Sequence, residues 1–336
     1  MTIVFRALAS LVVVLTMGAS VHAQEHPTYG PELEGFDYPF EVARYAFKSQ
    51  GMDVAMAYMD VKPRGTANGR TAVLLHGRNF CAATWEQTIT VLSTAGYRVI
   101  APDQIGFCKS TKPVGYQFSI QQLATNTHAL IASLGVTRAT VIGHSFGGMT
   151  GIRYALMFPE AVERLVLVNP IGLEDWQAEG VPFIDLDKQL EIEKATTFET
   201  VKRYQQQIYY AGQWKPEYDK WVAMSAGMYR GPGGDVVARV QARIAEMAFT
   251  QPVVHELERL RVPTLLMIGQ LDRTALGANR AAPEVAKRLG NYPELGRAAA
   301  RRIPQATLVA FADLGHAPQI SAPDRFHEAL LKGLAP

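Results

Sequence analysis

The stretch "ATVIGHSFGGMTGIRYALMFPE", residues 139–160, decides the fold of this chain. Its apolar, β-branched run up to Ile142 predicts a buried strand, and the small and apolar residues after Gly147 predict a helix. Ser145 stands between them with a glycine two residues away on either side. A strand that turns sharply into a helix needs small residues where the two backbones crowd together. The stretch therefore predicts that Ser145 is held in a strained turn above the edge of a sheet.

Apolar runs alternate with helical patterns on both sides of this unit. We predict a hairpin around Gly51, and further strands at 71–77, 98–103, 162–170, 262–272 and 306–316. The predicted helices lie at 84–97, with Thr84 as N-cap, near 123–134 and at 322–334. Strands this apolar, separated by helices of ~10–15 residues, indicate an α/β fold with a doubly wound, mostly parallel sheet.

The alternation stops between residues 171 and 255, where the sequence is helical, polar and rich in aromatic residues. We interpret 171–255 as a helical cap inserted over the carboxyl edge of the sheet, and 24–170 with 256–336 as the core. The aromatic and methionine side chains of 204–230 have two interpretations. They roof an apolar pocket for a hydrophobic acyl or alcohol group, or they pack the cap onto the core.

Residues 1–23 have the pattern of an export signal. Arg6 precedes an apolar run from about Leu8 to Met17, and small residues precede Ala23, after which we predict cleavage. The apolar run is shorter than the ~20 residues that span a bilayer, so we expect no stable membrane insertion after processing. An uncleaved anchor is the alternative. The mature protein is expected in the periplasm or outside the cell.

The chain has two cysteines, Cys81 and Cys108. Because disulfides persist in exported proteins, the two cysteines are expected either to form a bridge or to remain separate buried thiols.

The charge distribution argues against nucleic acid as a partner. The formal net charge is +2 at pH 7, and no run of basic residues is longer than Arg301-Arg302. A nucleic-acid footprint needs a basic stripe, which this sequence does not have. The histidines form no cluster with the spacing of metal ligands, and we predict neither a metal nor another cofactor.

Ser145 is a candidate nucleophile. A serine hydroxyl becomes reactive when a base takes its proton and donors stabilise the oxyanion that forms on the attacked carbonyl. The helix after Ser145 directs its positive end and the N–H of Phe146 toward such an oxyanion. A second N–H is expected from the loop after the strand at 71–77, where Arg78 is the first candidate and Asn79 the alternative.

Candidates for the base and the acid each end a later predicted strand. Ligands of open parallel sheets bind at these carboxyl ends, where His316 and Asp272 are found. His316 is predicted to deprotonate Ser145 and then protonate the leaving group, while Asp272 fixes the tautomer of the imidazole and stabilises its cation. Asp175, which follows the strand at 162–170, is the rival acid.

Three other polar residues near these motifs have structural interpretations. Asp103 is predicted to organise its own loop by hydrogen bonding. His76 is predicted to brace the oxyanion loop, and His144 to pack beside the nucleophile.

The motifs "LLHGRNF", "APDQIGFCKS", "GHSFGG", "GQLDRTA" and "LGHAPQ" resemble the successive motifs of the α/β-hydrolase fold superfamily, and of its capped serine hydrolases, over residues 40–334. The resemblance implies an eight-stranded sheet with a helical cap. It also places the loops of the two cysteines side by side, which favours a bridge. The roles that it implies are nucleophile for Ser145, acid for Asp272, base for His316, and oxyanion donors for Phe146 and Arg78. The sequence departs from many relatives by a bulky cation in "HGRNF" and by a cysteine in "FCKS" where glycine is common.

A serine at this turn points to acyl transfer, since relatives that open epoxides or displace halide use an aspartate there. We therefore expect an exported serine hydrolase that cleaves a carboxylic ester or lactone of a small, partly hydrophobic acyl substrate. One alternative is another serine-dependent activity, namely perhydrolysis or cleavage of an amide or carbon–carbon bond. The other is a non-catalytic protein that binds a small molecule on the same fold.

Overall fold

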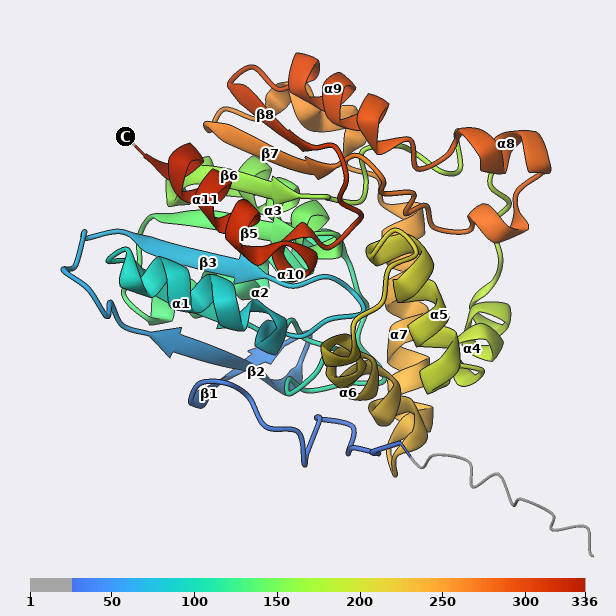
Figure 1. Cartoon of the computed structure of the whole chain (residues 1–336). Helices are drawn as coiled ribbons and strands as arrows, with labels where there is room; N and C mark the ends of the chain where they lie inside the picture. Colours follow the sequence, from blue (N-terminus) through green and yellow to red (C-terminus); the bar gives the residue numbers. More distant parts are fainter. Residues whose placement is uncertain (1–25, 336) are drawn as a thin grey trace, which may run out of the picture.

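The structure is a computed structural model, and it describes residues 26–335 (Figure 1). Eight strands form one sheet in the order β1-β2-β4-β3-β5-β6-β7-β8. The strands are β1 (Val42–Ser49), β2 (Met52–Val61), β3 (Thr71–Leu75), β4 (Arg98–Pro102), β5 (Ala139–His144), β6 (Val162–Val168), β7 (Thr264–Gly269) and β8 (Ala306–Phe311). Strand β2 is antiparallel to both of its neighbours, and all other pairs are parallel. The predicted mostly parallel, eight-stranded sheet is confirmed, while the predicted export signal lies outside the described residues.

The antiparallel start of the sheet is the hairpin expected around Gly51. Gln50 and Gly51 link β1 to β2, with φ angles of 53° and 75°. Positive φ at both central residues is the geometry of a two-residue turn whose twist matches that of the flanking strands. Glycine adopts such a φ without steric cost, which explains its place in the turn.

Helices cover both faces of the sheet. On one face lie α1 (Glu86–Thr94) and α11 (Pro323–Leu334), and on the other lie α2 (Ile120–Ser133), α3 (Phe146–Met157) and α9 (Tyr292–Arg302) (Figure 1). The side chains between helices and sheet form a separate buried apolar cluster on each face. The sheet is therefore doubly wound, and its central strands are buried on both sides, as their apolar sequences predict.

The helix predicted at 84–97 begins later than expected. A 3₁₀ turn, Ala82–Trp85, precedes α1, and Trp85 is the N-cap residue. The hydroxyl of Thr84 donates to the carbonyl of Cys81 at 2.7 Å and caps no helix. The prediction of Thr84 as N-cap was wrong, because the chain already turns before the α-helix starts.

Between β6 and β7 the chain forms helices that lie together beyond one end of the sheet (Figure 1). They are α4 (Leu186–Lys194), α5 (Phe198–Tyr204), a π-helical turn (Gln205–Tyr209), α6 (Asp219–Arg230) and α7 (Gly234–Thr250). Two short helices lie on either side of β8 in the sequence: α8 (Pro283–Arg288) precedes it and α10 (Pro318–Ser321) follows it. We keep the name cap for residues 171–255, the segment so interpreted from the sequence. Within the described residues, no helix has both the length and the apolar character to cross a bilayer.

The segment 26–39, which has no sequence pattern, packs between the cap and the core. The amide of Tyr29 donates to the carbonyl of Gly227 in α6 at 3.0 Å. A Cβ added at Gly231 would lie 1.8 Å from the carbonyl oxygen of Tyr29, so a side chain at 231 would displace the segment. Leu33 is fully buried, and its carbonyl accepts from the ammonium of Lys109. The segment therefore ties α6 to the loop after β4.

His327 makes the fold sensitive to acid. Its Nε2 lies 2.9 Å from the hydroxyl of Thr88, and burial between α1 and α11 lowers its pKa to about 4. A histidine whose pKa is lowered by folding contributes stability above its unfolded pKa near 6.5, and this contribution is lost as the pH falls toward 4. We expect His327 to account for a loss on the order of 2 kcal/mol in the free energy of unfolding between pH 7 and pH 4.5.

Urea unfolding of the wild type and of the His327→Gln variant at both pH values measures this effect. Glutamine can hydrogen-bond to Thr88 but does not titrate, so the variant should lose less stability on acidification than the wild type. Equal losses in the two proteins would contradict the assignment to His327.

Candidate active site

Ser145 follows β5 directly and is the N-cap residue of α3. Its φ of 56° and ψ of −119° are values that residues other than glycine rarely adopt. A Cβ added at Gly143 would lie 2.3 Å from the carbonyl oxygen of Gly147, and one added at Gly147 would lie 2.1 Å from that of Leu75. The two glycines are thus required by the close approach of strand and helix. The predicted strained turn is present, with Ser145 at its corner.

His316 and Asp272, distant in sequence, are hydrogen-bonded. Nδ1 of His316 lies 2.6 Å from Oδ2 of Asp272, and both side chains are fully buried. Because the carboxylate oxygen accepts, Nδ1 carries the hydrogen, and Nε2 of the neutral ring keeps its lone pair. Nε2 has no hydrogen-bond partner among residues 26–335. The pair therefore presents an unoccupied basic nitrogen.

Donors on every side hold the carboxylate of Asp272 in this orientation. Oδ1 accepts from the amide of Thr274 at 2.8 Å and from its hydroxyl at 2.7 Å. Oδ2 accepts from the side-chain amide of Asn169 at 2.8 Å as well as from His316. The oxygen of the Asn169 side chain accepts from the amide of Gly269 at 2.9 Å, which fixes which end of this amide faces the carboxylate.

His144, the residue before Ser145, connects this turn to the loop of His316. Nε2 of His144 donates to the backbone carbonyl of His316 at 2.9 Å, and the two rings lie 4.8 Å apart. Burial, together with the nearby His316, keeps the pKa of His144 well below its usual value, so His144 is neutral and positions the loop. Since Nε2 of His316 is unpartnered, Ser145 is not hydrogen-bonded to it in the described structure. Such catalytic hydrogen bonds commonly form when substrate binds.

The rival acid, Asp175, lies elsewhere. Its Oδ2 is 2.8 Å from Nε2 of His255, and its Oδ1 accepts from the amides of Gln177 and Ala178. The structure brings Asp272, and not Asp175, to the ring of His316.

The loop after β3 forms a tight turn against Ser145. The amide of Phe80 donates to the carbonyl of Gly77 at 3.1 Å, with Arg78 and Asn79 at the two central positions. A Cβ added at Gly77 would lie 3.1 Å from the Cβ of Ser145, so the loop is in contact with the nucleophile candidate. The closing bond uses neither the N–H of Arg78 nor that of Asn79.

The N–H of Phe146 is the other predicted oxyanion donor. Phe146 is the first residue of α3, where helix geometry provides no intrahelical acceptor for the amide. The oxyanion roles of Phe146 and of Arg78 or Asn79 stay predictions.

His76 braces the loop, as the sequence suggested. Its Nε2 accepts from the amide of Gln104 at 3.2 Å, so its Nδ1 carries the hydrogen and donates to the carbonyl of Gly77 at 2.9 Å. Burial lowers the pKa of His76, which keeps the ring neutral in this bridge.

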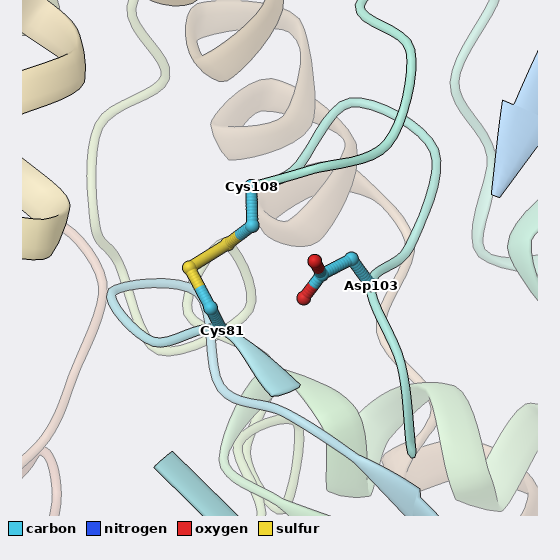
Figure 2. Close-up of side chains that lie close together, drawn as sticks. All are labelled: Cys81, Asp103 and Cys108. Carbon is cyan, nitrogen blue, oxygen red and sulfur yellow. A yellow bond between two sulfur atoms is a disulfide. The ribbon is translucent and has the colours of Figure 1, made fainter. Parts of the chain in front are cut away.

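Cys81 and Cys108 form a disulfide between the loops after β3 and β4 (Figure 2). The carboxylate of Asp103 lies beside the bridge and accepts from the amide of Ala82 at 2.8 Å and from that of Lys109 at 3.1 Å. Asp103 thus organises both loops. Metal binding by cysteine requires a thiolate, and these sulfur atoms are bonded to each other, so the three residues do not form a metal site. The φ of Cys108 is 46°, a conformation that explains why glycine is common at this place in the relatives that the sequence resembles.

Replacing both cysteines with serine is expected to lower the free energy of unfolding by about 3–4 kcal/mol, because the bridge closes a loop of about 28 residues in the unfolded chain. Urea unfolding of the double variant measures the loss, and reduction of the wild type should reproduce it. The double variant should not respond to reductant. An unchanged unfolding midpoint would show that the bridge does not stabilise the fold.

Aromatic residues of the cap divide into two groups. Tyr210 stacks on Tyr218, and Trp214 meets both rings edge to face, with ring centroids 4.0–5.6 Å apart; the three side chains pack the cap. The ring of Tyr209 instead lies 4.6 Å from that of His316, and its hydroxyl accepts from the side-chain amide of Asn79 at 3.0 Å. The packing interpretation therefore applies to Tyr210, Trp214 and Tyr218, while the apolar pocket for a substrate stays a prediction.

The backbone of Tyr209 also holds the loop of His316. Its carbonyl accepts from the amide of Ala317 at 3.3 Å, and a Cβ added at Gly315 would lie 2.5 Å from the same oxygen. Tyr209 ends the π-helical turn, a distortion that is frequent at functional sites. The cap is thus in direct contact with the loop of His316 and with the loop of Asn79.

The guanidinium of Arg78 extends into the cap. Its Nη2 lies 2.5 Å from Oε1 of Glu193 in α4 and 3.4 Å from the carbonyl of Gln241 in α7. The bulky cation of "HGRNF" is therefore accommodated by a carboxylate of the cap.

Sequence reasoning missed Asn169, Tyr209 and Glu193. Asn169 follows β6 at the same edge of the sheet as Asp272 and His316, and that position could have identified it. Tyr209 and Glu193 lie in cap helices among many polar and aromatic residues, where no local signal distinguishes them.

Comparison with known proteins agrees with this architecture. A family model described as alpha/beta hydrolase fold matches residues 72–323. The crystal structure of a probable hydrolytic enzyme from Pseudomonas aeruginosa PAO1 is similar, with 61% identity, a TM-score of 0.92, and coverage of 93% of this chain and 99% of that one. An esterase from Exiguobacterium antarcticum has the same fold, at 21% identity and a TM-score of 0.64 over 83% of this chain and 95% of its own.

A curated relative is 2-hydroxy-6-oxo-2,4-heptadienoate hydrolase of Pseudomonas putida. It is 30% identical over 115 residues, which are 34% of this chain and 42% of that protein. The chain thus spans less than half the length of the curated relatives that it matches. The family model covers most of the sequence, and the three similar proteins described above are named as hydrolytic enzymes. The chain belongs to the α/β-hydrolase fold family.

Proposed function

We propose that this protein is a serine hydrolase that cleaves a carboxylic ester or lactone through an acyl-enzyme on Ser145. The observation that carries the proposal is the buried hydrogen bond between Nδ1 of His316 and Asp272, which leaves Nε2 unpartnered beside the turn that holds Ser145. A base with a fixed tautomer next to a strained serine is the arrangement that activates a hydroxyl for attack on a carbonyl.

In the proposed reaction, Oγ of Ser145 attacks the substrate carbonyl while Nε2 of His316 takes the hydroxyl proton. Asp272 stabilises the imidazolium and prevents the ring from rotating. The imidazolium then protonates the leaving alkoxide, and the acyl group remains on Ser145 as an ester. A water molecule, deprotonated by His316, attacks this ester; the imidazolium then returns the proton to Oγ of Ser145 as the bond to the acyl group breaks and the acid leaves.

The negative charge that develops on the carbonyl oxygen needs donors that are in place before the reaction. The N–H of Phe146 and that of Arg78, with Asn79 as the alternative, are the proposed donors. The positive end of α3 adds to the stabilisation of the same charge.

The surroundings of His316 favour an acyl group with some apolar surface. Tyr209 and Phe80, whose rings lie 5.4 Å apart, meet at the base and the oxyanion loop. We also propose that the protein is exported to the periplasm or beyond, a location in which a disulfide such as Cys81–Cys108 persists.

Pre-steady-state kinetics with p-nitrophenyl esters test the proposal. An acyl-enzyme releases p-nitrophenol in a burst equal to the enzyme concentration when deacylation is slow, or turns over steadily when it is fast. A panel of acyl lengths and a simple lactone then define the substrate class. A pure binding protein would give neither burst nor turnover. Turnover of a peroxide, amide or carbon–carbon substrate alone would favour another serine-dependent activity.

A further inference from the structure

Arg78 occupies an unusual place for a cation. Its backbone belongs to the turn that touches Ser145, yet its guanidinium is largely buried between the core and α4. A buried charge carried by this turn can affect which substrates bind, because charges interact strongly where water is excluded.

The carboxylate of Glu193 pairs with this charge and is itself held by two further hydrogen bonds. Its carboxylate is 5% exposed, and its Oε1 accepts from Arg78 at 2.5 Å and from the side-chain amide of Gln189 at 2.8 Å. Its Oε2 accepts from the hydroxyl of Tyr229 at 2.8 Å. Tyr229 and Gln189 therefore hold Glu193 in place, and Glu193 neutralises Arg78.

The guanidinium keeps unused donor capacity. Nε of Arg78 is buried and has no hydrogen-bond partner among the described residues. Arg78 also lines a small cavity between the core and the cap, together with Asn79, Phe80 and Tyr229. Lys112 lines the same cavity and donates to the carbonyls of Cys108 and Ser110.

The cavity that Arg78 lines adjoins the base through Tyr209. The hydroxyl of Tyr209 accepts from the side-chain amide of Asn79 at 3.0 Å and its ring lies 5.4 Å from that of Phe80, and both Asn79 and Phe80 line the cavity. The Tyr204 ring packs 5.4 Å from that of Tyr209, which covers His316. The surroundings of Arg78 and the ring of His316 therefore share contacts with Tyr209.

We infer that Glu193 determines the charge selectivity of the acyl site: by neutralising Arg78, it makes the enzyme select uncharged acyl groups over acyl groups that carry a carboxylate. The inference rests on the proposed ester hydrolysis. With Glu193 present, an anionic chain next to Arg78 would meet the carboxylate of Glu193 and lose its own hydration. Without Glu193, Arg78 becomes an uncompensated cation with free donors, which matches a substrate carboxylate. Selectivity is a difference between two affinities, and removal of one repulsive charge changes it directly.

The test compares two esters of nearly equal shape at pH 7: mono-p-nitrophenyl glutarate, which is anionic, and p-nitrophenyl 5-methylhexanoate, which is neutral. The wild type should hydrolyse the anionic ester with a kcat/KM at least tenfold below that of the neutral ester. Glu193→Gln keeps the hydrogen-bonding shape but removes the charge, and should raise the ratio of anionic to neutral kcat/KM at least tenfold, mainly through KM. This gain should fall with added salt.

Two controls separate charge from general damage to the cap. Glu191 lies on the same helix and pairs with Lys188 at 2.6 Å in an exposed position, so Glu191→Gln should leave the ratio unchanged. Removing both charges in Arg78→Met/Glu193→Gln should return the ratio to the wild-type value, although its absolute rates will change. If Glu193→Gln alone does not fold, the wild-type ratio for the two esters decides, because equal acceptance of both esters would overturn the inference.

Three results would overturn the inference. They are a wild type that accepts both esters equally, a folded Glu193→Gln variant with an unchanged ratio, and a double variant that keeps the gain. A failure of the proposed function would instead appear as no turnover of either ester by the wild type.

Discussion

Replacing Ser145 with alanine is expected to reduce kcat for a p-nitrophenyl ester by about 10⁴- to 10⁶-fold, the range found when the nucleophile of a serine hydrolase is removed. Without Oγ no acyl-enzyme forms, and the burst of p-nitrophenol should disappear together with turnover. Stopped-flow and steady-state assays of the purified variant measure both.

The fold should tolerate this change. Ser145 makes no side-chain capping bond at the start of α3, so alanine removes no contact that holds the turn. The melting temperature should therefore match that of the wild type. Ser133→Ala, at the end of α2, is a matched control that should keep full activity. A Ser145→Ala variant that retained a tenth of wild-type kcat would contradict the proposed mechanism.

Replacing Asp272 with asparagine is expected to reduce kcat by about 10⁴-fold, the size of effect seen when the acid of such a triad is made neutral. The reason lies in the donors around the side chain. Thr274 presents an amide and a hydroxyl to one oxygen, so the carbonyl of the new amide should face Thr274. Its NH₂ group then faces His316 and donates to Nδ1. The ring hydrogen must move to Nε2, and His316 can no longer accept a proton from Ser145.

Asp175→Asn is the matched control, since Asp175 pairs with His255 and not with His316. It should change kcat by less than about twofold, as expected of a substitution far from the reacting atoms. KM should change little in either variant. The opposite pattern, a large loss in Asp175→Asn with an active Asp272→Asn, would assign the acid to the other residue.

The sequence contained enough to predict the sheet and the turn at Ser145. Buried strands such as β5 have long apolar runs, and glycines such as Gly143 and Gly147 are required by backbone contacts that any sequence with this turn must satisfy. Both features depend on residues close together in the sequence, so a short segment is enough to predict them.

The start of α1 shows where local reasoning fails. Thr84 is a good N-cap residue by type, but its hydroxyl bonds back to Cys81 within a 3₁₀ turn. The disulfide and the contacts of Asp103 fix the loop before the helix begins, and these are tertiary contacts.

The contacts between core and cap could not be predicted for a related reason. Glu193 and Arg78 are separated by 115 residues, and either could have been an ordinary solvated charge. Tyr209 resembles its neighbours Tyr204 and Tyr210 in the sequence, yet it alone of these three contacts the ring of His316 in the described structure. Which aromatic residue faces the site depends on the phase of a helix that contains a π-turn, and residue type does not reveal this phase.

The central claim is that Ser145 is the residue that becomes acylated. A fluorophosphonate probe forms a stable bond with an activated serine, so labelling followed by digestion and mass spectrometry identifies the nucleophile directly. We expect one adduct per chain, on the peptide that contains Ser145, and much slower labelling in Asp272→Asn. An adduct on a different residue, or stoichiometric labelling of the Ser145→Ala variant, would contradict it.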